Sequence, residues 1–218
     1  MVRQIFYEQI QELLENLLAM GHVVAHSIDR AIQALVNQDE ALAHEVIAFD
    51  DQINAAQYDI DEQCLVLIAT QQPMASDLRI LLAASNIASE LERIGDYTEG
   101  IAKLAIKLAD RPMLKPLIDI PRMAELGREM LIRALQGFIS QDSQIAQQIG
   151  DEDDLVDALY DQVYRELLVY MMEDPRTITQ ATYLLWVAHN LERIADRTTN
   201  IAERIVFTSS GKVVDLNR

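Results

Sequence analysis

An internal repeat constrains the fold of this chain more than any other feature of the sequence. The acidic segment LERIGD at residues 91–96 returns as LERIAD at residues 191–196. At a spacing of 103, residues 31–39 also match residues 134–142, so the similarity extends well beyond the acidic segment. Self-similarity on this scale predicts two structurally similar units in tandem.

Each half of the sequence is typical of three long helices. Gly and Pro number only 7 and 5 and cluster where turns are expected. Pro73 and Pro175 end the second helix of each half, because proline lacks the N–H that a helix interior needs. Asn37 and Ser140 are expected to end the first helix and cap the second, with Glu40 completing a capping box after Asn37. The helices are expected at residues 3–36, 39–71, 74–109, 121–139, 142–173 and 176–207.

Helices of these lengths with short turns favour tall antiparallel bundles. The predicted fold is therefore all-α, with two tandem pseudo-repeated antiparallel three-helix bundles. Pro112, Pro116 and Pro121 crowd the segment between the halves. We expect a first bundle over residues 1–110, a Pro-rich linker over 111–120, a second bundle over 121–208 and a polar tail over 209–218.

The charge of the chain excludes several kinds of partner. It carries 35 acidic and 18 basic residues, a formal net charge of -17, which repels nucleic acid and anionic lipid. Cys64 is the single cysteine, which fits a reducing compartment. The N-terminal residues lack the apolar core of a signal peptide, and the longest stretch free of charge, residues 177–191, is shorter than the roughly 20 residues of a spanning helix. We expect a cytoplasmic protein that binds no nucleic acid and meets a membrane only through partners.

The repeated carboxylates have level partners on the preceding helix. Glu92 lies 19 residues after Pro73 and Asn54 lies 19 before it, and Asp96 and Asp50 are both 23 residues away. In the second half, the pair at 153 and 157 and the pair at 192 and 196 lie at similar distances from Pro175. Antiparallel helices rise equally from their turn, so the two pairs of each half are expected to face each other.

Four oxygen ligands at one height repel each other unless a cation or water screens them. An all-oxygen set favours hard ions such as Mg, Mn, Ca or iron. His189, Asn200 and Glu203 extend the acidic strip of the second half, whereas Asn54 predicts weaker binding in the first. The candidate metal ligands are Asp153, Asp157, Glu192, Asp196, Asn200 and Glu203 in the second half, and Asp50, Asn54, Glu92 and Asp96 in the first.

Two other interpretations of the carboxylates remain open. They form a solvated acidic face on a purely structural helical scaffold, with Arg93 and Arg193 in local ion pairs, or they serve a metal-dependent helical enzyme of the di-iron carboxylate type. The sequence contains neither a Gly-rich phosphate loop nor the Glu-x-x-His repeat of di-iron oxidases. We therefore expect a protein that is not an enzyme and has no catalytic residues.

The chain resembles the PhoU family of phosphate-uptake regulators. The resemblance rests on the two Glu-Arg-Ile-x-Asp segments, on residues 72–79, which are similar to the family's Pro-x-Ala-x-Asp-Leu-Arg signature, and on residues 170–178. It implies two similar three-helix bundles and a cytoplasmic, non-enzymatic regulator that restrains the phosphate-starvation response. The partners it implies are the ATPase subunit of a Pst-type phosphate transporter, a PhoR-type sensor histidine kinase and a second copy in a homodimer.

The resemblance also bears on metal and on one turn. Some family members hold iron or other metal clusters at paired acidic motifs, which correspond here to Asp153/Asp157 with Glu192/Asp196 and to Asp50/Asn54 with Glu92/Asp96. Separately, Asp77 and Arg79 have no counterpart in the second half, and this asymmetry predicts a role in partner contact. The alternative is local, with Asp77 complementing a helix N-terminus and Arg79 forming a nearby pair.

Overall fold

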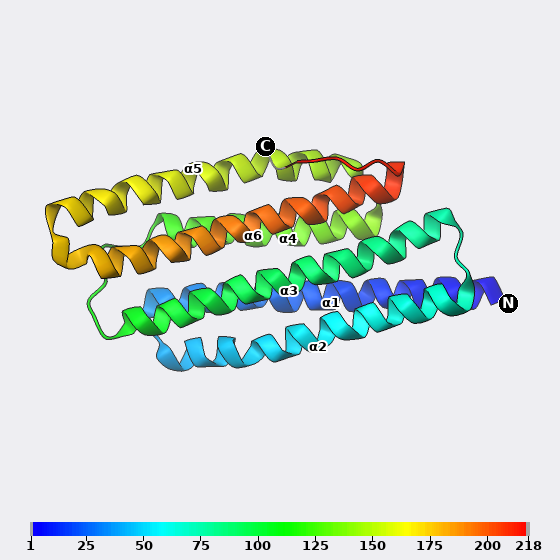
Figure 1. The fold of residues 1–218 in the computed structure, drawn as a ribbon, viewed down its shortest axis with the longest axis horizontal. Helices are drawn as coiled ribbons and strands as arrows, with labels where there is room; N and C mark the ends of the chain where they lie inside the picture. Colours follow the sequence, from blue (N-terminus) through cyan, green and yellow to red (C-terminus); the bar gives the residue numbers. More distant parts are fainter. Residues whose placement is uncertain (1, 217–218) are drawn as a thin grey trace.

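The computed structural model describes residues 2–216, and over this range the chain forms six long helices, one 3-10 turn and no strand. This confirms the predicted all-helical fold (Figure 1). The first three helices are α1 (Val2–Asn37), α2 (Glu40–Gln71) and α3 (Ala75–Ala109). The other three are α4 (Asp119–Ser140), α5 (Ser143–Glu173) and α6 (Ile178–Ser210), with the 3-10 turn at Pro175–Thr177. No helix within residues 2–216 is long and apolar enough to cross a membrane.

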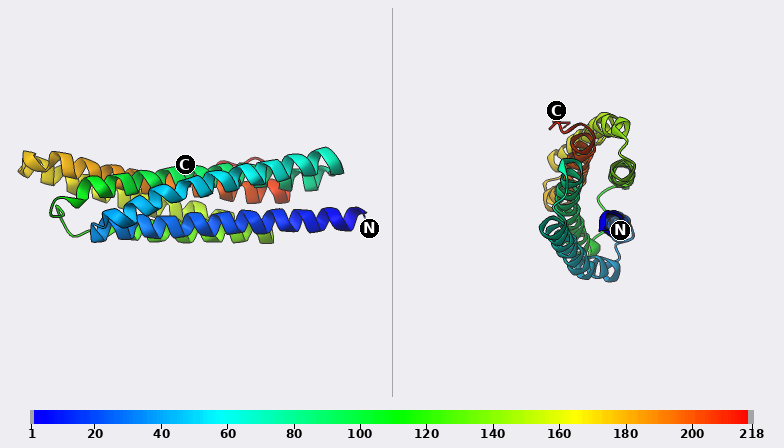
Figure 2. Two further views of the ribbon diagram at one scale, coloured as in Figure 1. Left: turned by 90° about the horizontal axis from the view of Figure 1, so that it is seen from below. Right: turned by 90° about the vertical axis from the view of Figure 1, so that its right-hand side faces the viewer.

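The six helices form two layers. Helices α2, α3, α6 and α5 lie side by side in one curved layer, and α1 and α4 cover one of its faces (Figures 1 and 2). Helices α3 and α6 pack on each other in the middle of the layer, and α1 packs on α4 behind them. The exposed side chains of α3 and α6 therefore lie on the face of the layer turned away from α1 and α4.

A single hydrophobic core runs through both halves. Apolar side chains at spacings of three and four residues bury one stripe of each helix, for example Leu13, Leu17, Met20 and Val24 of α1. Leu91 of α3 is also fully buried. The same core continues through α4 and α6, so the two three-helix units pack against each other as well as within themselves.

The prediction that Asn37 and Ser140 cap the following helices is wrong. Both residues end their own helices, and Asp39 and Asp142 are the N-caps of α2 and α5. Their carboxylates accept hydrogen bonds of 3.0 Å from the backbone N–H of Leu42 and Gln144, respectively. The intervening residue takes the left-handed conformation, with φ of 54° at both Gln38 and Gln141, and this reversal delays the next helix.

The linker between the halves is fixed to the second half. Lys115 is buried and forms an ion pair with Glu166 of α5, and Gln162 donates a hydrogen bond of 3.2 Å to Asp119 at the start of α4. At the other side, the Gln38 side chain donates to the carbonyl oxygens of Leu108 and Arg111 at the end of α3. Pairing of these polar groups holds a Pro-rich segment in one conformation.

Two left-handed glutamines give a matched test of these turns. Replacing Gln72, which is exposed at φ 47°, with Gly is expected to raise the unfolding free energy by about 0.5–1 kcal/mol, because Gly adopts this conformation without steric strain. Replacing Gln38 with Gly relieves the same strain but removes its bonds to the end of α3, so a net loss of about 1 kcal/mol is expected. Urea denaturation of both variants measures the difference, and equal effects at the two positions would contradict it.

Candidate functional site

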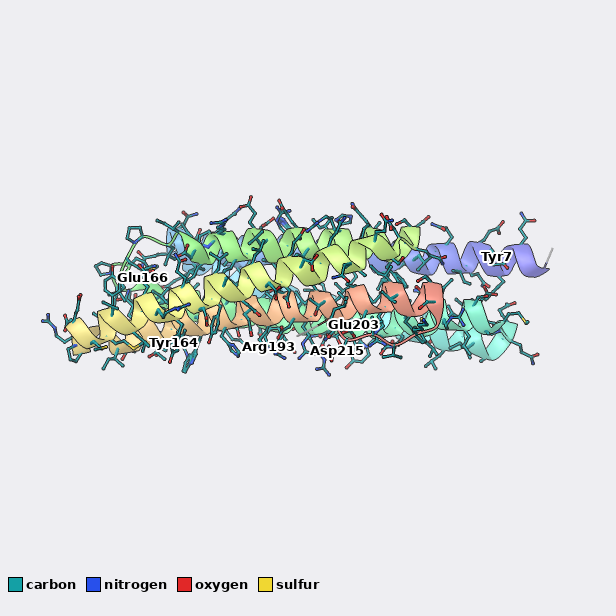
Figure 3. All side chains as sticks on the ribbon, turned by 90° about the horizontal axis from the view of Figure 1, so that it is seen from above. Tyr7, Tyr164, Glu166, Arg193, Glu203 and Asp215 are labelled. Atoms are coloured by element: carbon teal, nitrogen blue, oxygen red, sulfur yellow. The ribbon has the colours of Figure 1, made fainter. Side chains whose placement is uncertain are left out.

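The four paired carboxylates of the second half lie on the neighbouring helices α5 and α6. The negative charge of Asp196 on α6 raises the pKa of both Asp153 and Asp157 on α5. The charge of Asp157 raises the pKa of Glu192 in the same way. The pairs therefore face each other from neighbouring antiparallel helices. Figure 3 labels Arg193, which follows Glu192, midway along α6, and Glu203 nearer the C-terminal end of that helix.

Asp153 and Glu192 each have one buried carboxyl oxygen that accepts no hydrogen bond in the described structure. Asp153 is only 7% exposed, and burial, then the charge of Asp157, raises its pKa to about 7. Burial and the charge of Asp196 raise the pKa of Glu192 to about 7 as well. Oδ1 of Asp153 and Oε2 of Glu192 are buried and accept no hydrogen bond from any described residue. Such atoms are costly for a fold to retain, which suggests that they serve a ligand.

Helices α2 and α3 carry a less strongly charged version of the same arrangement. Burial, then the charge of Asp96, raises the pKa of Asp50, and burial and Asp96 likewise raise the pKa of Glu92. The amide of Asn54 donates a hydrogen bond of 2.8 Å to Oδ2 of Asp50 and so stabilises that carboxylate. In the second half, the corresponding Asp157 repels the carboxylate of Asp153 instead. Oδ1 of Asp50 is buried without a partner in the described structure.

One acidic residue near Asp50, Glu99, was not predicted from the sequence. Glu99 adds to the negative potential at Asp50. It follows Glu92 by seven residues and therefore lies on the same face of α3, which is the signal that could have identified it. The corresponding residue of α6 is Thr199, so the second half has no counterpart of this carboxylate.

Two predicted ligands lie away from the α5–α6 carboxylates. Nδ2 of Asn200 donates to Oε2 of Glu90 on α3 at 3.3 Å, and Oε1 of Glu203 accepts from the backbone N–H of Leu216 at 3.0 Å. The helical pitch explains this correction. At about 100° per residue, Asn200 is turned roughly 80° from Glu192, and Glu203 is about 16 Å farther along the axis.

The paired carboxylates of α5 and α6 do not converge on a single point. Within residues 2–216, no three His, Cys, Asp or Glu side chains converge in an arrangement ready to hold a metal ion. Asp196 instead pairs with Arg193 at 2.5 Å, and Nδ1 of His189 lies 3.4 Å from Oε2 of Glu192. Mutual repulsion and these local pairs keep the groups apart. The all-oxygen donor set, in which Oδ1 of Asp153 is buried without a partner in the described structure, nevertheless fits a hard cation.

The structure places Asp77 and Arg79 at the start of α3. Asp77 lies in the first helical turn, where its charge complements the helix dipole. Arg79 lies against the C-terminal end of α6, where a Cβ on Gly211 would be 3.7 Å from Nη1. Arg79 thus links the two halves, and its predicted role in partner contact stays a prediction.

The raised pKa values predict how the stability of the metal-free protein depends on pH. The ordinary pKa values of Asp153 and Glu192 are 3.8 and 4.5, and both rise to about 7 in the folded state. The folded protein therefore binds more protons between these limits, so the unfolding free energy falls as pH rises through this window and levels off above it. Urea denaturation in chelator should show a difference of about 5 kcal/mol between pH 5 and pH 8 that largely disappears in Asp153→Asn/Glu192→Gln, because each of the two groups contributes roughly 2 pKa units in this window at about 1.4 kcal/mol per unit. An equally steep dependence in the double variant would contradict this assignment.

Comparison with known proteins places this arrangement in a family. The PhoU domain model matches residues 17–105 and again residues 120–205, once for each half. The chain belongs to the PhoU family. The relatives include the PhoU homolog of Aquifex aeolicus, a phosphate-specific transport system accessory protein that is 42% identical over 95% of this chain and 94% of its own. The homolog of Rhizobium meliloti is 40% identical over 94% of this chain and 87% of its own.

Solved structures of PhoU proteins share the fold. The crystal structure of PhoU from Pseudomonas aeruginosa superposes with a TM-score of 0.90 at 36% identity, covering 95% of this chain and all of its own. PhoU from Streptococcus pneumoniae, a phosphate transport system regulatory protein, gives a TM-score of 0.89 at 31% identity, over 96% of this chain and 99% of its own. Both PhoU repeats are therefore present here at nearly full length.

Proposed function

We propose that this protein is a non-enzymatic accessory regulator of a phosphate-specific transport system. The observation that carries the proposal is the match of both halves to the PhoU domain, together with relatives named as transport accessory proteins that align over nearly their whole length. A relative of known structure is named a phosphate transport system regulatory protein, which supports the same role.

The proposed mechanism is coupling between proteins. The chain would act in the cytoplasm, contact the ATPase subunit of a Pst-type transporter and a PhoR-type sensor histidine kinase, and hold the phosphate-starvation response off when phosphate is plentiful. The long two-layer body offers an extended surface for two partners (Figure 1). We also propose a homodimer, which would present two such surfaces.

A bound metal ion is the second element of the proposal. Asp153, Asp157, Glu192 and Asp196 would hold a hard cation such as iron, Mg or Mn between α5 and α6. The ion would supply positive charge where four carboxylates otherwise repel one another. The support is the buried Oδ1 of Asp153, which has no partner in the described structure, and the pKa values of about 7 that burial and repulsion produce at Asp153 and Glu192. Asp50, Asn54, Glu92 and Asp96 would form a weaker second site.

Capture from cells tests the proposed partners. A tagged copy of the protein, expressed at its natural level in phosphate-replete cells, is expected to retain the transporter ATPase subunit, the sensor kinase or both after crosslinking. An unrelated acidic helical protein with the same tag is the control for adhesion. Failure to enrich either partner above that control, in replete and in starved cells, would contradict the proposal.

A further inference from the structure

A basic and aromatic patch lies at one end of the seam between α3 and α6. Its residues are Lys103 and Lys107 of α3, Arg111 just beyond that helix, and Tyr183 and Trp186 of α6. This group is called the seam patch below. It lies at the end of the molecule where α3 ends and α6 begins (Figure 1).

Three side chains of the seam patch form a chain of contacts. Nζ of Lys107 lies 5.4 Å from the centre of the Tyr183 ring, and the rings of Tyr183 and Trp186 are 5.8 Å apart. Trp186 is 50% exposed, although it is the largest apolar side chain in the sequence. Lys107, Arg111 and Tyr183 also line a surface hollow of about 220 Å³, together with the carboxylate of Asp110.

The positive charge of the patch is only partly neutralised. Lys103 pairs with Glu99 at 2.5 Å. In the described part of the chain, neither Lys107 nor Arg111 has a carboxylate within 4 Å. Two cations beside an exposed Trp are unusual on a chain with a net charge of -17. With Asp110 in the same hollow and Glu99 paired to Lys103, the surface keeps a small excess of positive charge, opposite to the net charge of the chain.

The repeat shows that the fold does not require the patch. At the opposite end of the seam, Glu203, Phe207 and Gly211 of the second half replace the three basic residues, and Ala83 and Asn86 replace Tyr183 and Trp186. Complementing the dipole at the end of α3 explains Lys107, which lies in the last turn. Lys103 has its local pair with Glu99, but neither explanation accounts for Arg111 or for the exposed Trp.

We propose that the seam patch binds an acidic segment of a protein partner, with Trp186 as the apolar anchor and Lys103, Lys107 and Arg111 as the charge complement. This inference rests on the proposed function and deepens it by naming an interface. Exposed Trp and Arg residues are the types that dominate binding at protein interfaces. Charge complementarity selects a carboxylate-rich segment as the occupant of the patch.

The test measures binding of the purified full-length protein to the transporter ATPase subunit and to the cytoplasmic part of the sensor kinase. The variant Lys103→Glu/Lys107→Glu/Arg111→Glu is expected to weaken binding of one partner at least about tenfold, and Trp186→Ala by a similar factor. The control Arg122→Glu/Arg165→Glu/Lys212→Glu changes exposed residues outside the patch and makes the same change in net charge. Denaturation curves verify that each variant is folded.

A spectroscopic measurement reports on the patch itself. Trp186 is the only Trp, so a chain labelled with fluorotryptophan has a single fluorine resonance that must shift when the partner binds. Wild type that binds neither partner would defeat the proposed function and the patch together. If wild type binds while the patch variant binds equally well, or if the resonance does not move, the patch alone is contradicted.

Discussion

Replacing Asp153 with Asn is expected to remove most of the metal from the proposed site between α5 and α6, with a loss of affinity of about 100-fold or more. Asp153 is the most buried of the four carboxylates, and its Oδ1 has no competing partner in the described structure. The amide keeps the shape of the side chain and removes its charge. Isothermal titration with Mn²⁺ or Fe²⁺ after chelation, followed by elemental analysis, measures the change.

The controls separate this site from general acidity. Asp151→Asn makes the same change two residues away, at an exposed position whose carboxylate accepts from Gln147, and is expected to leave the metal content unaltered. Asp50→Asn is expected to affect only the weaker proposed site between α2 and α3. If wild type prepared without chelator contains no metal and gains none on titration, the metal part of the proposal is wrong.

Replacing Gly21 with Val is expected to cost about 3 kcal/mol or more of unfolding free energy, because it overpacks the contact between α1 and α4. A Cβ built on Gly21 lies 2.1 Å from Cδ1 of Leu135, and Leu135 is itself buried at 2% exposure. The leucine therefore has little room to move away. Thermal and urea denaturation measure the loss.

Two further variants test the cause of that loss. Gly150→Ala places a Cβ no closer than 3.8 Å to any neighbour and is expected to stabilise α5 by up to about 1 kcal/mol through helix propensity. Leu135→Ala is expected to be destabilising alone but to offset part of the loss in Gly21→Val, since it vacates the space that the new side chain needs. Strict additivity of the two substitutions would show that α1 and α4 do not meet as described.

The helices were predictable because their stop signals are local. Proline and a 3.6-residue apolar period place each helix within about three residues, and equal rise from a turn brings the acidic pairs level. The N-caps were misplaced because the left-handed turn at Gln38 and Gln141 is formed by residues with no strong preference for it. The packed helices, and not the turn residues, hold that conformation.

The details of the site depend on three-dimensional packing. Sequence placed Asn200 and Glu203 on the acidic strip, but helical rotation directs Asn200 to Glu90, and the folded-back tail uses Glu203. The burial of Asp153 also follows from the fit of α5 against its neighbours, which no spacing rule gives. The seam patch was missed because its two parts are about 80 residues apart in the chain.

The most direct test of the proposed regulatory role is a phosphate-starvation promoter fused to a reporter, in cells that lack this protein and grow in ample phosphate. The proposal predicts that the reporter is constitutively active in these cells and that expression of the wild-type chain restores repression. A reporter that stays repressed without the protein, and responds normally when phosphate is withdrawn, would contradict the role of negative regulator.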